Sequence, residues 1–296
     1  MLALVAVTIW TAVLTLPDDK LHVVFCDVGQ GDAILVYRKT TQMLIDGGPN
    51  NRVLACLGRH VPFYDRRIEM VVVTHPQADH LNGILDVVER YNVMQLVMGR
   101  EGNNTAGYKN LRFKIQESRI NVQNLYSGDE LRLGDVRFEV VWPTRNFVLA
   151  HTLPLAPLLN LGEGNERGEV VLGAKTDGMD LNKFGISGRL TYGDFDVMLT
   201  ADVDQGVEPQ EIATGLLRQV EILKVPHHGS KTGMTREWID IMSPELAVIS
   251  VGKNSYGHPS TEALNLLSSK HARVLRTDRD GEVEVVSDGK EWWVVK

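Results

Sequence analysis

The chain has 296 residues, which is long enough to bury a large core as one α/β domain or as two smaller ones. Its formal net charge of −7 excludes a nucleic-acid-binding protein whose whole surface is basic, although a local basic cleft is compatible with this charge. Two cysteines, Cys26 and Cys56, exclude a disulfide scaffold and a four-thiolate zinc site. Their apolar surroundings favour buried free thiols over a single disulfide.

The first 16 residues carry no charge, and they end at Pro17. As a helix they would span roughly 24 Å, against ~30 Å for the core of a bilayer. They also lack the basic region and the cleavage site of a typical signal peptide. We expect a membrane-proximal or tethering segment over residues 1–18, with a buried element or an uncleaved signal as the alternatives, and a folded domain over residues 19–296.

Short apolar runs and glycine-rich corners alternate from residue 21 onward. They predict strands at 21–28, 32–37, 42–46, 68–74 and 94–99, with helices at 52–61, 80–91 and 107–118. Residues 144–182 contain two prolines and many glycines, and are predicted to be an irregular insertion. A hairpin at 188–202 then leads into strands at 220–226 and 246–251 and helices at 236–242 and 261–269. This order is typical of helices that cover paired sheets.

The two halves of the chain repeat one pattern. A hairpin ends in Asp46, and a helix and a strand then lead to His75, which is 29 residues further on (75 − 46). A second hairpin ends in Asp202, and a helix and a strand then lead to His228, which is 26 residues further on (228 − 202). Two such copies would face each other with their polar residues at matching strand ends. The repeat therefore predicts a dinuclear metal site at a shared edge.

The segment "VVVTHPQADHLNG" places His75, Asp79 and His80 directly after an apolar strand. Imidazoles and a carboxylate suit zinc, manganese or iron, although an Asp-His pair can also cap a helix. Asp202 ends another apolar strand, where an unpaired carboxylate would be costly to bury. With His228 from the second half, these residues are the predicted metal ligands, and Asp79 and Asp202 are also catalytic candidates.

Five further residues are candidates for supporting or substrate-binding roles. Asp46 is either a turn residue or a carboxylate that orients a ligating histidine, and Asp32 borders a corner that is either structural or part of a substrate loop. His227 competes with His228 for the ligand position, and the repeat favours His228. His258 follows another strand end and is a candidate acid for a leaving group or a phosphate contact. Lys231, like Lys224 and Lys253, is either a solvated lysine or a contact for a phosphate backbone.

Taken together, these motifs resemble the metallo-β-lactamase-fold domain of ComEC-type DNA uptake proteins. The resemblance runs in order from residue 21 to the C-terminus and leaves out only residues 144–182. The matching segments are "DVGQGDAILV", "MLIDGG", "VVVTHPQADHLNG", "LTYGDFDVMLTAD", "LKVPHHGS", "YGHPS" and "RTDRDGEVEV".

The resemblance implies a four-layer αββα sandwich whose metal site binds one or two divalent ions, zinc or manganese. His75, Asp79, His80, Asp202 and His228 match the metal positions of the family. The wider superfamily has a histidine where Gln77 stands. We therefore expect an asymmetric centre that is stronger on the side of Asp79, His80, Asp202 and His228.

The implied activity is a metal-dependent DNA phosphodiesterase that acts on single-stranded or duplex DNA. The implied partner is a membrane channel protein or domain, and we expect a membrane-associated domain that is extracytoplasmic. Two alternatives stay open. One is a metallo-hydrolase of small esters or phosphoesters, since this fold hosts many chemistries, and the other is a degenerate domain that binds DNA without cleaving it. The sequence does not give the oligomeric state.

Overall fold

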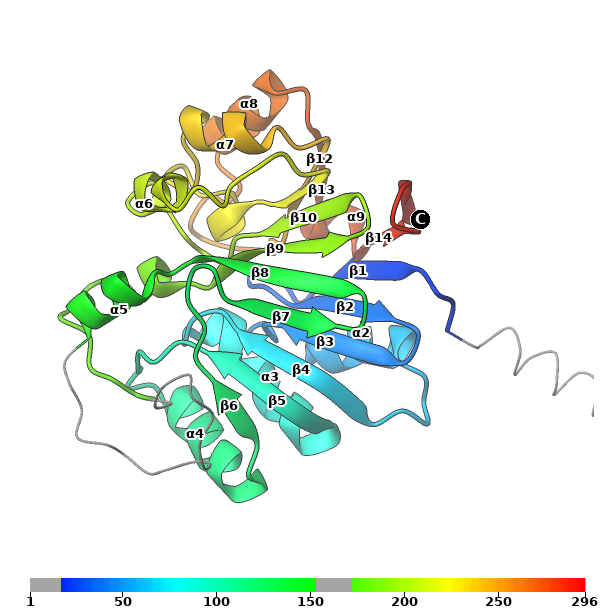
Figure 1. Cartoon of the computed structure of the whole chain (residues 1–296), viewed down its shortest axis with the longest axis vertical. Helices are drawn as coiled ribbons and strands as arrows, with labels where there is room; N and C mark the ends of the chain where they lie inside the picture. The colour runs from blue at the N-terminus through cyan, green and yellow to red at the C-terminus, as the bar shows by residue number, and fades with distance from the viewer. Residues whose placement is uncertain (1–16, 153–171, 296) are drawn as a thin grey trace, which may run out of the picture.

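A computed structural model of the chain describes residues 17–152 and 172–295, and in these ranges the strands form two mixed sheets (Figure 1). The first sheet has eight strands in the order β15 (Trp292–Val295), β14 (Val283–Ser287), β1 (Leu21–Phe25), β2 (Ile34–Arg38), β3 (Thr41–Ile45), β4 (Arg67–Val73), β5 (Asn92–Met98) and β6 (Asn121–Gln123). The second has seven in the order β13 (Arg273–Arg276), β12 (Leu246–Ile249), β11 (Ile222–Lys224), β10 (Phe195–Leu199), β9 (Ser187–Tyr192), β8 (Val136–Trp142) and β7 (Glu130–Leu133).

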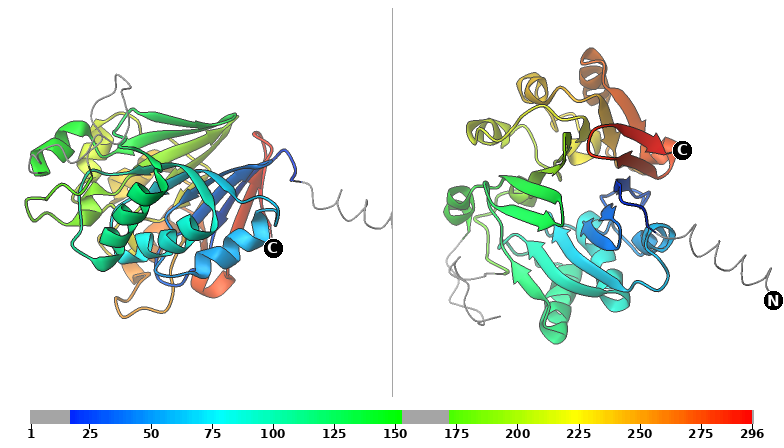
Figure 2. Two further views of the ribbon diagram at one scale, coloured as in Figure 1. Left: turned by 90° about the horizontal axis from the view of Figure 1, so that it is seen from below. Right: turned by 45° about the vertical axis from the view of Figure 1, so that its right-hand side comes forward.

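Helices cover the outer faces of both sheets (Figure 2). Apolar side chains of α2 (Arg52–His60), α3 (Ala78–Arg90) and α4 (Ala106–Ser118) pack on the eight-stranded sheet. Those of α6 (Glu208–Ala213), α7 (Arg236–Met242) and α8 (Thr261–Ser269) pack on the seven-stranded sheet. The remaining short elements are α5 (Arg145–His151), α9 (Thr277–Asp280) and the 3-10 turns η1 (Leu181–Phe184) and η2 (Pro226–Gly229). The predicted αββα sandwich is thus confirmed.

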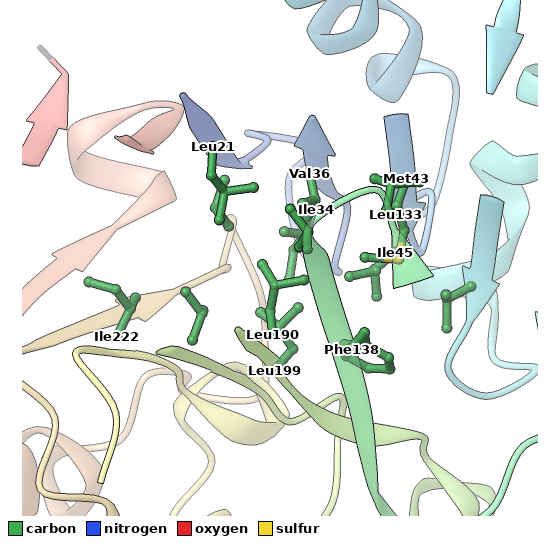
Figure 3. Packing of buried hydrophobic residues seen from close by; sticks show 14 of the residues in the cluster. Leu21, Ile34, Val36, Met43, Ile45, Leu133, Phe138, Leu190, Leu199 and Ile222 are labelled. Atoms are coloured by element: carbon green, nitrogen blue, oxygen red, sulfur yellow. The ribbon is translucent and has the colours of Figure 1, made fainter. Parts of the chain in front are cut away.

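The inner faces of the two sheets enclose the largest apolar cluster, shown in Figure 3. Leu21, Ile34 and Ile45 reach into it from the first sheet, while Phe138 and Leu190 come from the second. Because side chains alternate across a strand, each sheet gives one face to this core and the other to its helices. The sheets are thereby fixed face to face, which fixes how their strand ends meet.

The repeat seen in the sequence is present as structure. In the first half β2 and β3 form an antiparallel hairpin, and β4 lies parallel to β3. In the second half β9 and β10 form the hairpin, and β11 lies parallel to β10. Since parallel neighbours end at the same side of a sheet, each half delivers its aspartate and its histidines to one edge.

Two glycine-rich segments bring the start of α3 against the loop that follows β3. The N–H of Gly47 donates to the carbonyl of His80 at 2.7 Å, and the N–H of Gly83 donates to the carbonyl of Gly48 at 3.0 Å. A Cβ on Gly83 would collide with the carbonyl oxygen of Gly47. Glycine at position 83 therefore permits the close approach that holds His80 beside Asp46.

The expectation of free thiols is wrong, because Cys26 and Cys56 form a disulfide. The prediction that both cysteines are buried is confirmed. Their proximity arises because α2 packs on the sheet beside the end of β1, which single-residue context cannot indicate. The bond joins the loop that carries Asp32 to the helix that follows the Asp46 loop.

The stretch 144–182 is more regular at its ends than the sequence indicated. Thr144 caps α5 by accepting a hydrogen bond from the N–H of Phe147 at 3.1 Å, and η1 closes the stretch. Residues 153–171 lie outside the described ranges, as do residues 1–16 of the predicted tethering segment. Among the residues that the structure does describe, no helix combines the length and the apolar character needed to cross a bilayer.

Reduction of the disulfide should destabilise the domain. The bond closes a loop with a sequence separation of 30 residues, and the loop-closure entropy of such a loop corresponds to roughly 3–4 kcal/mol. Urea unfolding of the full chain, measured with and without a phosphine reductant, should show this loss. A Cys26→Ala/Cys56→Ala variant should be insensitive to reductant, and an equal response from that variant would contradict the prediction.

The stability of the domain should also fall as the pH rises through neutrality. Burial, with a smaller effect of Glu208, raises the pKa of Glu211 to about 7 although Ser187 and Trp238 donate hydrogen bonds to it. The folded state therefore binds a proton that the unfolded state, with a pKa near 4.5, has lost. This contribution is present at pH 4.5 and below, and is lost as the pH passes 7.

In the wild type, ionisation of Glu211 should lower the unfolding free energy by an amount on the order of 3 kcal/mol between about pH 5 and pH 8. Glu211→Gln should remove this fall, because the amide cannot ionise. Urea titrations across this range measure the effect. Glu117→Gln, an exposed residue of α4, is the matched control and should leave the slope of the wild type intact. An unchanged slope in Glu211→Gln would show that Glu211 does not cause it.

Candidate metal centre

Four side chains from both halves of the chain meet where the strands end. Nε2 of His80 lies 3.3 Å from Oδ2 of Asp202, and Nε2 of His228 lies 3.2 Å from the same oxygen. Oδ2 of Asp79 is 3.5 Å from Nε2 of His228 and 3.9 Å from Nε2 of His80. All four atoms lie within 4.8 Å of one another. Two histidines and two carboxylates at such separations form a donor set that suits zinc or manganese.

Hydrogen bonds at the far side of each ring orient both histidines. Nδ1 of His80 lies 2.8 Å from Oδ2 of Asp46, and Nδ1 of His228 lies 2.8 Å from the carbonyl oxygen of Ser250. Since these oxygens only accept, each Nδ1 donates to its partner, and each Nε2 points to the centre, where it can ligate a cation that displaces its proton. Asp46 is therefore in contact with a candidate ligand and is not a solvated turn residue.

The buried atoms at this point include acceptors without a hydrogen-bond donor. Nε2 of His80, Nε2 of His228 and Oδ1 of Asp202 are buried and lack a hydrogen-bond partner among the described residues. Burial alone would lower the pKa of His228, but Asp202 and Asp32 raise it to about 10. The same negative field that holds a proton at this point would hold a divalent cation. The residues present thus fit a metal ion.

A second group with suitable spacing, Asp32, Asp46 and the Nδ1 side of His80, already contains a cation. The ammonium of Lys224 pairs with Oδ2 of Asp32, lies 3.6 Å from Oδ1 of Asp202 and donates to the carbonyl of Ala201 at 2.8 Å. Lys224 is fully buried and paired, so both alternatives given for it, a solvated lysine and a contact for a phosphate backbone, are wrong. Because Lys224 neutralises this group, the first group is the better candidate for a metal ion.

The centre is asymmetric. His75 is buried beside His80, with ring centroids 4.1 Å apart, but it does not join the group of four. Burial, then His80, lowers the pKa of His75 to about 3, so this imidazole is neutral. Gln77 directly precedes α3 in the N-cap position, and its side chain makes no capping hydrogen bond. The side chain of Asp79 is 33% exposed whereas those of its three companions are buried, so the centre faces solvent at Asp79.

Several residues at the centre adopt a left-handed backbone, which is unfavourable for any residue other than glycine. They are Asp46 (φ 59°), Ala201 (φ 48°), His227 (φ 48°) and His228 (φ 53°), which are half of the eight such residues described. Backbone strain of this kind persists where surrounding structure enforces it, and it gathers at functional sites. The strand ends are thus bent to aim their side chains at one point.

Three further predicted residues flank the centre. His227 turns away from the group of four, and its ring lies 5.6 Å from that of His258. Lys231 is exposed, three residues after His228. The sequence did not indicate Asn182, whose Nδ2 lies 3.4 Å from Nε2 of His227. Its only sequence signal is a polar residue placed just before the second hairpin.

Comparison with known proteins agrees with this architecture. The family model described as "Beta-lactamase superfamily domain" matches residues 41–150. The chain is 25% identical to ComE operon protein 3 of Bacillus subtilis over 277 residues, which are 87% of this chain and 32% of that protein. It is also 25% identical to Competence protein ComA of Neisseria gonorrhoeae, over 90% of this chain and 32% of that protein. The chain thus spans about a third of the length of these curated relatives, and its resemblance to ComEC-type proteins is confirmed.

Solved structures with the same fold are more distant in sequence. The metallo-β-lactamase fold protein YhfI from Bacillus subtilis aligns with a TM-score of 0.53 at 12% identity, covering 93% of this chain and all of that one. CmlA, a diiron β-hydroxylase from Streptomyces venezuelae, aligns with a TM-score of 0.51 at 13% identity, covering 90% of this chain and 54% of that one. At this identity the likeness shows the fold alone. The chain therefore has the metallo-β-lactamase fold.

The group of four should bind about one divalent ion per chain, since a tetrahedral zinc site needs four donors. Asp202→Asn removes a central negative charge and should weaken binding by more than the ~10–100-fold typical of changes around the ligands. Elemental mass spectrometry and chelator competition measure this. Asp196→Asn, on the same strand β10, is the control and should keep the ion. Equal loss in both variants would contradict the assignment.

Proposed function

We propose that this chain, which has the metallo-β-lactamase fold and resembles ComEC-type competence proteins, is a metal-dependent phosphodiesterase that cleaves DNA. The observation that carries the proposal is the buried set of acceptors at His80, Asp202 and His228, with Asp79 at its solvent side. Metal ions held in this way serve hydrolysis in many folds. The proposed ligands are these four residues, and His75 stands beside them without belonging to the set.

When bound, a divalent ion supplies Lewis-acid activation of water and stabilises charge on a phosphoryl oxygen. Asp79 is the proposed acceptor for the proton of the attacking water. Burial alone would raise the pKa of Asp79, but His80 and His228 lower it well below its usual range, so the carboxylate stays ionised. Its 33% exposed side chain is also the member of the group that incoming water and substrate can reach.

His258 is the proposed contact for a phosphoryl oxygen. Burial, followed by the neighbouring His227 and His228, lowers the pKa of His258. The imidazole is therefore neutral at physiological pH, which favours holding the phosphate over giving a proton to the leaving group. Lys231, exposed nearby, adds positive charge for the DNA backbone. Lys224 acts differently, because it keeps Asp32 paired within the fold.

DNA as the substrate, a membrane channel protein or domain as the partner and an extracytoplasmic location belong to the same proposal. Two of the relatives are named as a recombination protein and a competence protein, and this chain spans about a third of the length of its relatives. The Cys26–Cys56 disulfide supports an oxidising compartment, because such bonds are rare where thiols are kept reduced.

The proposal is tested by incubating the purified full chain with Mn²⁺ or Zn²⁺ and fluorescent single-stranded or duplex DNA. Cleavage should require the ion, and Asp202→Asn should reduce it by more than about 100-fold, as loss of a ligand exceeds the effect of changes around the ligands. Asp196→Asn should cleave like the wild type.

Two other outcomes would replace the proposal. Cleavage of fluorogenic esters with DNA left intact would identify a small-molecule hydrolase. DNA binding without cleavage, in protein shown to contain its ion, would identify a non-catalytic DNA-binding domain.

A further inference from the structure

A series of aromatic rings leads from the surface to the candidate metal centre. The ring of Tyr256 lies 5.7 Å from that of His258, which lies 5.6 Å from the ring of His227. The ring of His227 in turn lies 6.4 Å from that of His228, a member of the group of four. Tyr256 is 74% exposed whereas His228 is buried. The series therefore connects solvent with the buried acceptors.

The outer end of this series is held in place by a built turn. Oδ1 of Asn254 accepts from the N–H groups of Tyr256 and His258, each at 3.0 Å. Nδ2 of Asn254 donates to the carbonyls of Gly252 and His258, each at 2.9 Å. The N–H of Ser260 donates to the carbonyl of Gly229 at 2.8 Å, which ties the loop to η2. The Tyr256 ring is thus exposed on a loop that is fixed beside the centre.

The inner end of the series carries polar atoms without partners. Oδ1 of Asn182, Nδ1 of His227 and Nδ1 of His258 are buried and have no hydrogen-bond partner among the described residues. Buried polar atoms normally have partners, and Asn182 as a whole is only 6% exposed. The backbone of His227 is left-handed, with φ at 48°. A phosphate oxygen can accept from Nδ1–H of His227 or His258, whereas Oδ1 of Asn182 only accepts and would need a donor from the ligand.

Other exposed aromatic residues lack this setting. Phe113 is 65% exposed on α4, and Phe63 is 86% exposed with its ring against Tyr64. Within the described ranges, neither ring contacts a histidine of the centre. An exposed aromatic ring is ordinary by itself. Tyr256 differs because its ring lies next to histidines whose buried nitrogens lack partners and which lead to the candidate metal centre.

We propose that Tyr256 is a positioning residue that stacks on the nucleobase next to the scissile phosphate, whose oxygens accept hydrogen bonds from the ring N–H groups of His258 and His227 and from Nδ2 of Asn182. This inference rests on the proposed function and adds to it the residues that bind the substrate. A ring can stack only on a base whose face is free, so the base must be unstacked on one side, as in a single strand or at the end of a duplex. Stacking of this kind tolerates any base, because every base has a π-face.

The base-stacking role is tested with a short single-stranded oligothymidylate and the same backbone without bases. Tyr256→Ala should raise KM for the base-bearing strand about 5- to 100-fold, the range typical of one lost stacking contact, and leave KM for the abasic strand unchanged. Tyr256→Phe keeps the ring and should retain the wild-type KM. Phe113→Ala, the matched control, should behave like the wild type. Equal effects of Tyr256→Ala on both strands would overturn the stacking role.

The phosphate contact is tested at Asn182. Asn182→Asp keeps the shape of the side chain but adds a negative charge, so it should weaken binding of both strands more than Asn182→Ala does. A purely structural role predicts the opposite order, since aspartate preserves the shape and alanine does not. Metal content and thermal unfolding are recorded for both variants. Equal binding by Asn182→Asp and the wild type would overturn this contact.

Binding measured by fluorescence anisotropy in EDTA separates this inference from the proposed function. Weaker binding of the base-bearing strand by Tyr256→Ala, in a chain that never cleaves DNA with its ion, would support the stacking role and refute the nuclease. Cleavage of base-bearing and abasic strands with the same KM would support the nuclease and refute the stacking role.

Discussion

Negative charge buried at the edge where the strands of the two sheets end is the constraint on which the rest of this structure depends. Asp32, Asp46 and Asp202 are each at most 2% exposed, and unpaired carboxylates at such positions would be strongly destabilising. Lys224 offsets part of this charge through Asp32, and the imidazole of His80 contacts Asp46 and approaches Asp202. The negative charge that these groups do not offset lies at Asp202 and Asp79, and a cation fits there.

The fold meets this constraint through its repeat. Each half places a hairpin beside a parallel strand, so each half brings one aspartate and its histidines to the same edge. The apolar core between the sheets holds the two edges in register, and the close glycine contacts at α3 set the depth of His80. Backbone strain at the left-handed residues of the strand ends accompanies the inward direction of these side chains.

The same arrangement separates structural from chemical roles among similar residues. Lys224 and Asp32 face each other and are fully buried, which fits a pair that maintains the site. Asp79 and His258 retain contact with solvent, which fits residues that meet substrate. Lys224 and Lys231 thus serve different purposes. A buried ammonium neutralises a buried carboxylate, whereas an exposed one is free to attract an anionic ligand.

The sequence by itself determined many of the strands and helices, helices that cover paired sheets and the residue types of the centre, because these follow from hydrophobic period and from the aspartate–histidine repeat. The four-layer αββα class came from the family resemblance of its motifs. It also predicted, from Gln77, a weaker metal site on the side of His75, and in the structure His75 lies outside the group of four. The metal occupancy of that side stays a prediction. Only the tertiary structure decided that Lys224 is buried, that the cysteines are bonded and that Asn182 lies beside His227. Each of these depends on how strand ends from distant parts of the chain are brought together, which side-chain periodicity along one segment does not encode.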